Sequence, residues 1–198
     1  LTEKLEAMGK RVMQVSFPDY DSPSSSLVKM YLAGDFGKKP EDVNPYAASL
    51  FYAVDRFASF RSRWKEFYES GGIIVADRYT TSNMVHQMTK YEDPEEEEKF
   101  VCWLEDTEYG KLELPRPDRV ILLDVPLPVT EKLVEKRSAN GTPMDIHEKN
   151  WTYLCRCAGA YGKLAERYGW FRIDCMKDGI LCGEEEIADA GLAAAGIK

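Results

Sequence analysis

Four short apolar runs along the chain predict β-strands, and helical or turn-forming stretches separate them. The runs cover Arg11–Phe17, Ile73–Asp77, Val120–Asp124 and Trp170–Asp174. Near-continuous apolar runs are typical of strands buried on both faces of a parallel sheet. Strands that alternate with helices in this way predict an α/β fold, a doubly wound parallel sheet with right-handed crossovers.

Apolar residues at helical spacing predict the connecting helices. They are expected near residues 1–8, 24–32, 45–70, 80–90, 91–109, 128–137, 145–168 and 183–195. In the long stretch 45–70, the residues at core spacing are Leu50, Val54, Phe57, Trp64 and Phe67, while Tyr52, Arg56 and Arg63 share a neighbouring stripe. Asp145 and Glu148 fit a capping box at the start of the 145–168 helix.

The ends of the predicted strands carry the residues of chemical interest. Ligands of open α/β sheets bind beyond the carboxyl ends of the strands, where Phe17-Pro18, Asp77-Arg78, Asp124 and Asp174 stand. Asp77 and Arg78 are therefore expected to meet a phosphate or a metal ion. The alternative is that the two simply pair with each other at the strand end.

The stripe of Tyr52 and Arg56 also has two interpretations. In one, an aromatic ring packs beneath a surface arginine. In the other, the ring stacks on a nucleobase and the guanidinium, one turn later, binds the base or a phosphate. The pattern alone leaves both open.

Composition narrows the function class. The 198 residues are 44% hydrophobic and 30% charged, and they contain no repeat or linker, so residues 1–198 are expected to form a single domain. A formal charge of −8 argues against a general nucleic-acid or membrane-surface binder. No membrane span or signal-peptide pattern is found, and the five cysteines fit neither a disulfide framework nor a zinc site. We expect a cytoplasmic protein.

Several phrases together resemble the thymidylate kinase family in order and spacing. They are Phe17-Pro18, Leu50–Arg56, Asp77–Gln87, Leu114–Asp118 before the third strand, and Lys136-Arg137 before an Asp-x-x-Glu helix. The resemblance covers nearly the whole chain. It implies a nucleoside monophosphate kinase with a fold like that of P-loop NTPases, which transfers the γ-phosphoryl group of ATP to dTMP, with Mg²⁺.

The resemblance also implies roles for individual residues. Phe17 and Pro18 would lie in the loop that faces the acceptor, Tyr52 would stack on thymine, and Arg56 would hold the nucleotide. Asn83 and Gln87 would lie by the base and His86 near the sugar. Asp77 and Arg78 would be the catalytic pair, with Asp77 at the metal. Arg137 would serve catalysis and ATP binding at the start of a lid over about residues 137–147. The resemblance further suggests a homodimer through the 45–70 helix.

Two departures from the family pattern stand out. Asp19 follows Pro18 where the family commonly has an arginine that reaches the acceptor phosphate, and the 198 residues contain no G-x-x-x-x-G-K-[ST]. We therefore expect a sequence that begins after its first strand and P-loop, that is inactive in this form, and that leaves two strand edges unpaired. The alternatives are a deoxynucleoside kinase of the same superfamily and a non-catalytic nucleotide-binding protein.

Overall fold

The four predicted strands are present and parallel. A computed structural model describes residues 1–197, in which β1 (Val12–Ser16) pairs with β2 (Ile73–Asp77), and β3 (Ile121–Asp124) with β4 (Phe171–Asp174). In the first pair Ser16 lies opposite Asp77, and in the second Asp124 lies opposite Asp174. The carboxyl end of each strand thus lies beside that of its neighbour, as the sequence predicted.

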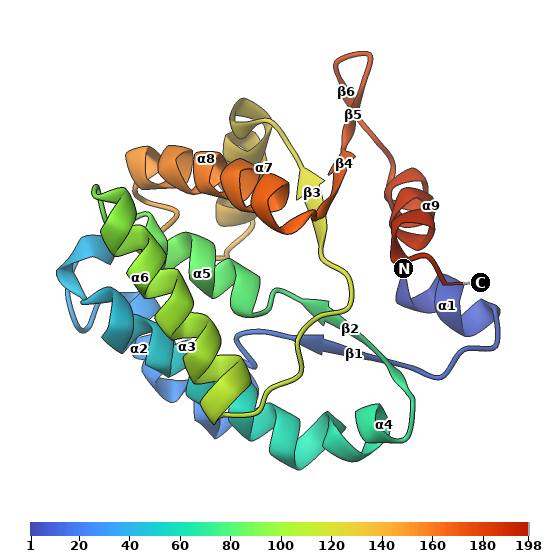
Figure 1. Cartoon of the computed structure of the whole chain (residues 1–198). Coiled ribbons are helices and arrows are strands. Elements are labelled where there is room, and N and C mark those ends of the chain that lie inside the picture. Colours follow the sequence, from blue (N-terminus) through green and yellow to red (C-terminus); the bar gives the residue numbers. More distant parts are fainter. Residues whose placement is uncertain (198) are drawn as a thin grey trace.

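The two strand pairs are not joined to each other within the described residues, and their strands are less buried than their apolar sequences predicted. The two pairs form separate two-stranded sheets, as Figure 1 shows, so β2 and β3 each have a single neighbouring strand. Their apolar side chains are only partly covered, and Leu123 is 52% exposed. Within residues 1–197, β2 and β3 therefore each have one edge without a neighbouring strand.

The helices follow the predicted order with shifted ends. They are α1 (Thr2–Ala7), α2 (Ser26–Ala33), α3 (Pro45–Ser59), α4 (Lys65–Glu69), α5 (Thr80–Met88), α6 (Pro94–Glu105), α7 (Leu127–Ala139), α8 (Trp151–Tyr168) and α9 (Glu184–Ala195). Short 3₁₀ turns are η1 (Pro23–Ser25) and η2 (Pro40–Asp42), and two π-helical turns, η3 (Phe60–Trp64) and η4 (Asp106–Lys111), follow α3 and α6. A hairpin of β5 (Met176–Lys177) and β6 (Ile180–Leu181) was not predicted.

The largest apolar cluster lies between α5, α6 and α8, which gather on one side of the molecule in Figure 1. Its fully buried members include Val85, Phe100, Leu104, Tyr153 and Leu164. This packing fixes α5, the helix that follows the Asp77 strand. The residues of α5 that face away from the cluster are therefore held rigidly at the strand end.

The predicted core face of the 45–70 helix is wrong at its first three positions, whereas Trp64 is 2% exposed and belongs to an apolar core cluster, as predicted. Leu50, Val54 and Phe57 are 42%, 51% and 37% exposed, whereas Ser49 and Arg56 of α3 are buried. Helical spacing identified an apolar stripe, but the side of α3 that packs against α5 is the polar one. A buried acidic partner of Arg56, described below, explains the reversal.

The start of the 145–168 helix is also wrong, although the predicted cap is real. Asp145 Oδ1 accepts hydrogen bonds from the backbone of His147 (2.8 Å) and Glu148 (2.9 Å), and Glu148 Oε2 accepts one from Asp145 N at 3.3 Å. These bonds close a single turn. The helix itself begins at Trp151, where the Asn150 side chain accepts a hydrogen bond from Tyr153 N.

Candidate active site

The carboxyl ends of β1 and β2 are joined by direct contacts. Phe17 N donates to Asp77 O at 3.0 Å, and Ser16 Oγ lies 3.4 Å from Asp77 Oδ2. The Phe17 ring packs against Tyr79, with centroids 5.9 Å apart, and the Phe17-Pro18 peptide bond is cis. The structure therefore brings the loop after β1 and the Asp77-Arg78 pair to one edge of this sheet.

Arg78 has an unusual backbone and a free head group. Its φ is +62°, in the left-handed region that costs a non-glycine residue free energy and is often tolerated at functional sites. Among the described residues it forms no ion pair within 4.0 Å, so the simple strand-end pair with Asp77 is not formed. The side chain lies within electrostatic range of Tyr52, Asp77 and Asp145. An unpaired cation thus faces the strand end.

Tyr52 lies on the same side. Its ring packs edge-on against Tyr31, with centroids 6.4 Å apart and planes at 88°. Burial, followed by the neighbouring Tyr31 and Asp145, raises the pKa of Tyr52 well above its usual range, so the hydroxyl is not ionised at neutral pH. A neutral ring beside the unpaired Arg78 is suited to stacking on a flat ligand.

Arg56 is not a surface residue, so the interpretation of an aromatic beneath a surface arginine is wrong. Its side chain is 2% exposed and binds Glu108 with two hydrogen bonds, from Nε to Oε2 at 2.7 Å and from Nη2 to Oε1 at 2.5 Å. Glu108 itself is fully buried. Arg56 therefore faces inward, from α3 toward the start of α5.

Asn83 lies at the same junction, and Gln87 is fully buried one turn further along α5. Asn83 Nδ2 donates to Ser49 O at 3.3 Å and to Glu108 Oε1 at 3.2 Å. Asn83 Oδ1 and Ser49 Oγ are buried and have no hydrogen-bond partner among residues 1–197. Buried polar atoms are rarely left unpaired, so these two point to a place that a bound molecule or water completes.

Two histidines close the next part of the site. The rings of His86 and His147 are stacked, and Tyr31 Oη lies 3.1 Å from His147 Nε2. Tyr153 Oη donates to the His86 carbonyl at 2.5 Å and lies 3.3 Å from His86 Nδ1. Cys157 Sγ lies 3.6 Å from the same Nδ1, so one ring nitrogen of His86 is held by both Tyr153 and Cys157.

The loop after β1 is held by a buried carboxylate. Asp55 accepts hydrogen bonds from Asp19 N at 2.8 Å and from Ser24 Oγ at 2.6 Å. The Asp19 carboxylate, which stands where the family commonly has an arginine, forms an ion pair with Arg63. Its negative charge is therefore compensated locally, away from Arg78.

Arg137 lies at the end of α7, next to the predicted lid. Its Nη2 lies 2.6 Å from both carboxylate oxygens of Glu148, so the end of α7 is tied to the turn that Asp145 caps. Residues 140–150, including most of the expected lid, contain no helix or strand. The arrangement connects Arg137 to the side of the site that holds Asp145 and His147.

Sequence reasoning missed Glu108, Asp55 and His147. A signal for Glu108 was present: Phe100, Leu104 and Glu108 follow one another at four-residue spacing, which places an acid on the apolar stripe of a helix. The side chains of Phe100, Leu104 and Glu108 are all fully buried. An acid at such a position predicts a buried cationic partner.

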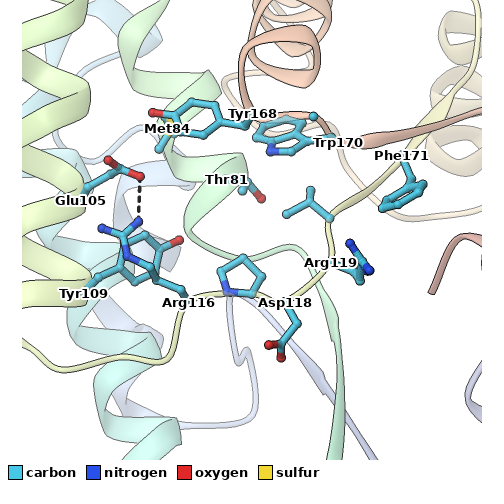
Figure 2. Close-up of a pocket in the computed structure, with 13 residues that line it drawn as sticks. Thr81, Met84, Glu105, Tyr109, Arg116, Asp118, Arg119, Tyr168, Trp170 and Phe171 are labelled. Carbon is cyan, nitrogen blue, oxygen red and sulfur yellow. Dashed lines mark hydrogen bonds and ion pairs between the residues drawn. The ribbon is translucent and has the colours of Figure 1, made fainter. Parts of the chain in front are cut away.

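A surface pocket lies apart from these residues (Figure 2). It is lined by Thr81, Met84 and Glu105 of the helices, by Arg116 to Val120, and by Tyr168 to Phe171. Arg116 donates to Glu105 at 3.0 Å, the dashed contact in Figure 2, and lies over the Tyr109 ring. Val120 and Phe171 stand at the amino ends of β3 and β4. None of the predicted site residues lines this pocket.

Within residues 1–197 no group of three or more histidines, cysteines or carboxylates is arranged to hold a metal ion. Asp77 is an exposed carboxylate at the strand end, with Ser16 as its hydroxyl neighbour. Carboxylate oxygen is the ligand type that Mg²⁺ accepts, and Mg²⁺ commonly takes one or two carboxylates together with substrate phosphates. Asp77 fits that mode, which needs no preformed cage of protein ligands.

Comparison with known proteins agrees with this geometry. The sequence profile described as thymidylate kinase matches residues 1–187. The thymidylate kinase of Mycobacterium tuberculosis strain H37Rv is 26% identical over 177 residues, which cover 86% of this chain and 80% of that protein. The probable thymidylate kinase of Thermococcus onnurineus is 32% identical over 127 residues, or 64% of this chain and 55% of that protein. This chain belongs to the thymidylate kinase family.

Proposed function

We propose that this chain binds dTMP at the carboxyl end of β2 and acts as a nucleoside monophosphate kinase, with ATP as the phosphoryl donor. The observation that carries the proposal is the unpaired Arg78 beside Tyr52, with Asp77 at the strand end. A ring for the base and a cation for the phosphate are the two features that a nucleotide monophosphate requires. Family membership identifies the base as thymine.

Phosphoryl transfer requires little covalent work from the protein. It needs the acceptor and donor phosphates in line, cations that neutralise the developing charge, and exclusion of water. Arg78 would hold the acceptor phosphate, and Arg137 would bring a second cation from the lid side. Asp77 would hold Mg²⁺, which would supply further charge neutralisation.

The first test measures binding alone. Titration calorimetry of the 198-residue chain should detect dTMP, and Tyr52→Leu should weaken it by about tenfold because the loss of a stacked base is worth over 1 kcal/mol. Tyr52→Phe is the matched control and should bind like the unsubstituted chain. Failure of the unsubstituted chain to bind dTMP would contradict the proposal.

The second test measures turnover. ADP release with ATP, Mg²⁺ and dTMP should be followed for these 198 residues and for a chain extended by the upstream coding sequence, because the P-loop motif is not found within the 198. Turnover with dTMP in the extended chain supports the kinase assignment. dTMP binding without turnover in either chain would leave a nucleotide-binding protein.

We also propose that this chain forms a homodimer and is located in the cytoplasm. Leu50, Val54 and Phe57 form an exposed apolar stripe on α3, which a second copy could cover. Light scattering should report a dimer, and Val54→Glu should yield a monomer. No helix within residues 1–197 has the length and apolar character required to span a bilayer.

A further inference from the structure

Glu108 is a fully buried acid near the proposed site and joins three elements. It lies on η4, its Arg56 partner lies near the end of α3, and Thr80 and Asn83 lie in the first turn of α5. Thr80 Oγ1 donates to Oε2 at 2.6 Å, and Asn83 Nδ2 donates to Oε1 at 3.2 Å. Each carboxylate oxygen thus accepts two hydrogen bonds, one of them from Arg56.

This pairing changes what Arg56 can bind. Glu108 takes two of the five guanidinium N–H groups and compensates the positive charge, which leaves three N–H groups on a nearly neutral unit. A phosphate brought to that unit would be repelled by the buried carboxylate and would lose its hydration. An uncharged carbonyl oxygen would accept the remaining N–H groups at lower cost.

The same carboxylate fixes the orientation of Asn83. Both Glu108 Oε1 and Ser49 O are acceptors, so the amide must turn its NH₂ group toward them. Asn83 Oδ1 is then left as a buried acceptor without a partner. The junction therefore offers the remaining N–H groups of Arg56 as the donor and Asn83 Oδ1 as the acceptor.

We propose that Glu108 is a positioning residue that makes this junction specific for a base with a carbonyl next to an N–H, which rests on the proposed function. Thymine presents that pair of groups, whereas cytosine presents an amino group and a bare ring nitrogen at the same edge. Glu108 holds Arg56 as the donor and Asn83 as the acceptor. The acceptor phosphate is left to the unpaired Arg78.

The test compares Glu108→Gln with the unsubstituted chain in titrations with dTMP, thymidine and dCMP. The glutamine amide keeps the shape but does not compensate the charge of Arg56, and it leaves Ser49 O as the charge-independent acceptor that orients Asn83. We expect affinity for dTMP and for thymidine to fall by the same factor, about tenfold, and the preference for dTMP over dCMP to shrink. Glu105→Gln, which removes a half-exposed ion pair with Arg116 on the same helical segment, should change neither.

The outcomes separate the two proposals. If the unsubstituted chain binds dTMP and Glu108→Gln binds it with the same affinity, this inference alone is overturned. A loss of affinity for dTMP but not for thymidine also overturns it, because that result would place Arg56 at the phosphate. No dTMP binding by the unsubstituted chain overturns the proposed function, and this inference with it. If Glu108→Gln does not fold, Thr80→Val serves in its place, because it removes one donor to the Glu108 carboxylate. This variant should lower the affinities for dTMP and for thymidine equally, by about twofold to fivefold. An unchanged affinity in Thr80→Val also overturns the inference.

Discussion

The His86 and His147 rings lie face to face, with centroids 5.0 Å apart and 14° between their planes. Two imidazolium ions could not occupy this arrangement without strong repulsion. Burial lowers the pKa of His147 to about 3, and burial together with the charges of His147 and Arg78 lowers that of His86 well below its usual range. Both rings are therefore neutral in the folded protein at physiological pH.

This stacking predicts a loss of stability on acidification. Below about pH 6.5 the unfolded chain takes up a proton at His147 that the folded chain does not, so the free energy of unfolding falls as pH falls toward 3. At pH 5.5 the loss from this residue is about 1.4 kcal/mol. Urea denaturation at pH 7.5 and 5.5 measures it. In His147→Gln the difference between the two pH values should be smaller; an equal difference would contradict the assignment.

Arg78→Gly separates backbone strain from binding. Glycine adopts a φ of +62° without the cost that arginine incurs, so the variant should be as stable as the unsubstituted chain, or more stable by about 1 kcal/mol. It should nevertheless lose affinity for dTMP while it retains that for thymidine. Thermal unfolding and calorimetry check the two parts. A marked loss of stability would show that Arg78 holds the fold rather than a phosphate.

Asp55→Ala tests the support of the loop after β1. The substitution leaves Asp19 N and Ser24 Oγ without their buried acceptor, and we expect a loss of about 2–3 kcal/mol in the free energy of unfolding. Asp42→Ala is a matched control, because Asp42 accepts two backbone hydrogen bonds at an exposed position. It should cost less than about 1 kcal/mol. Equal losses in the two variants would contradict a special role for Asp55.

The open strand edges predict an alternating pattern of hydrogen exchange. Ile73 N donates to Arg11 O, and Phe171 N and Cys175 N donate to Val120 O and Asp124 O, which fixes the direction of every second amide. The amides of Ile74, Ala76, Ile121 and Leu123 then point away from the one strand that pairs with each of them within residues 1–197. Nuclear magnetic resonance should find them exchanging at least about tenfold faster than those of Val75 and Leu122. Equal protection along β2 would mean that its second edge is covered.

The strands and their chemistry were predictable because they depend on local signals. Apolar runs that end in Asp77 and Asp124 need no knowledge of the partners. The β5–β6 hairpin could also have been found, since Asp178-Gly179 is a strong two-residue turn signal.

The burial of α3 could not be predicted from its own sequence. Its apolar stripe suggested a core, but the side of Arg56 is the one that meets Glu108, which lies 52 residues further along the chain. Helical periodicity identifies a face and does not identify what covers it. Likewise, the cap at Asp145 is formed as predicted, yet the chain closes one turn there and begins α8 again at Trp151.

The division of the strands into two pairs has a consequence for how the enzyme is assembled. Tyr52, Arg78, Asn83 and His86 all lie on the chain between β1 and α6, whereas Arg137 follows β3. No strand ladder within residues 1–197 connects the two groups mechanically. If the proposed roles hold, Arg137 is joined to the residues around Tyr52 and Arg78 through side chains, by its ion pair with Glu148 and the stacked rings of His147 and His86.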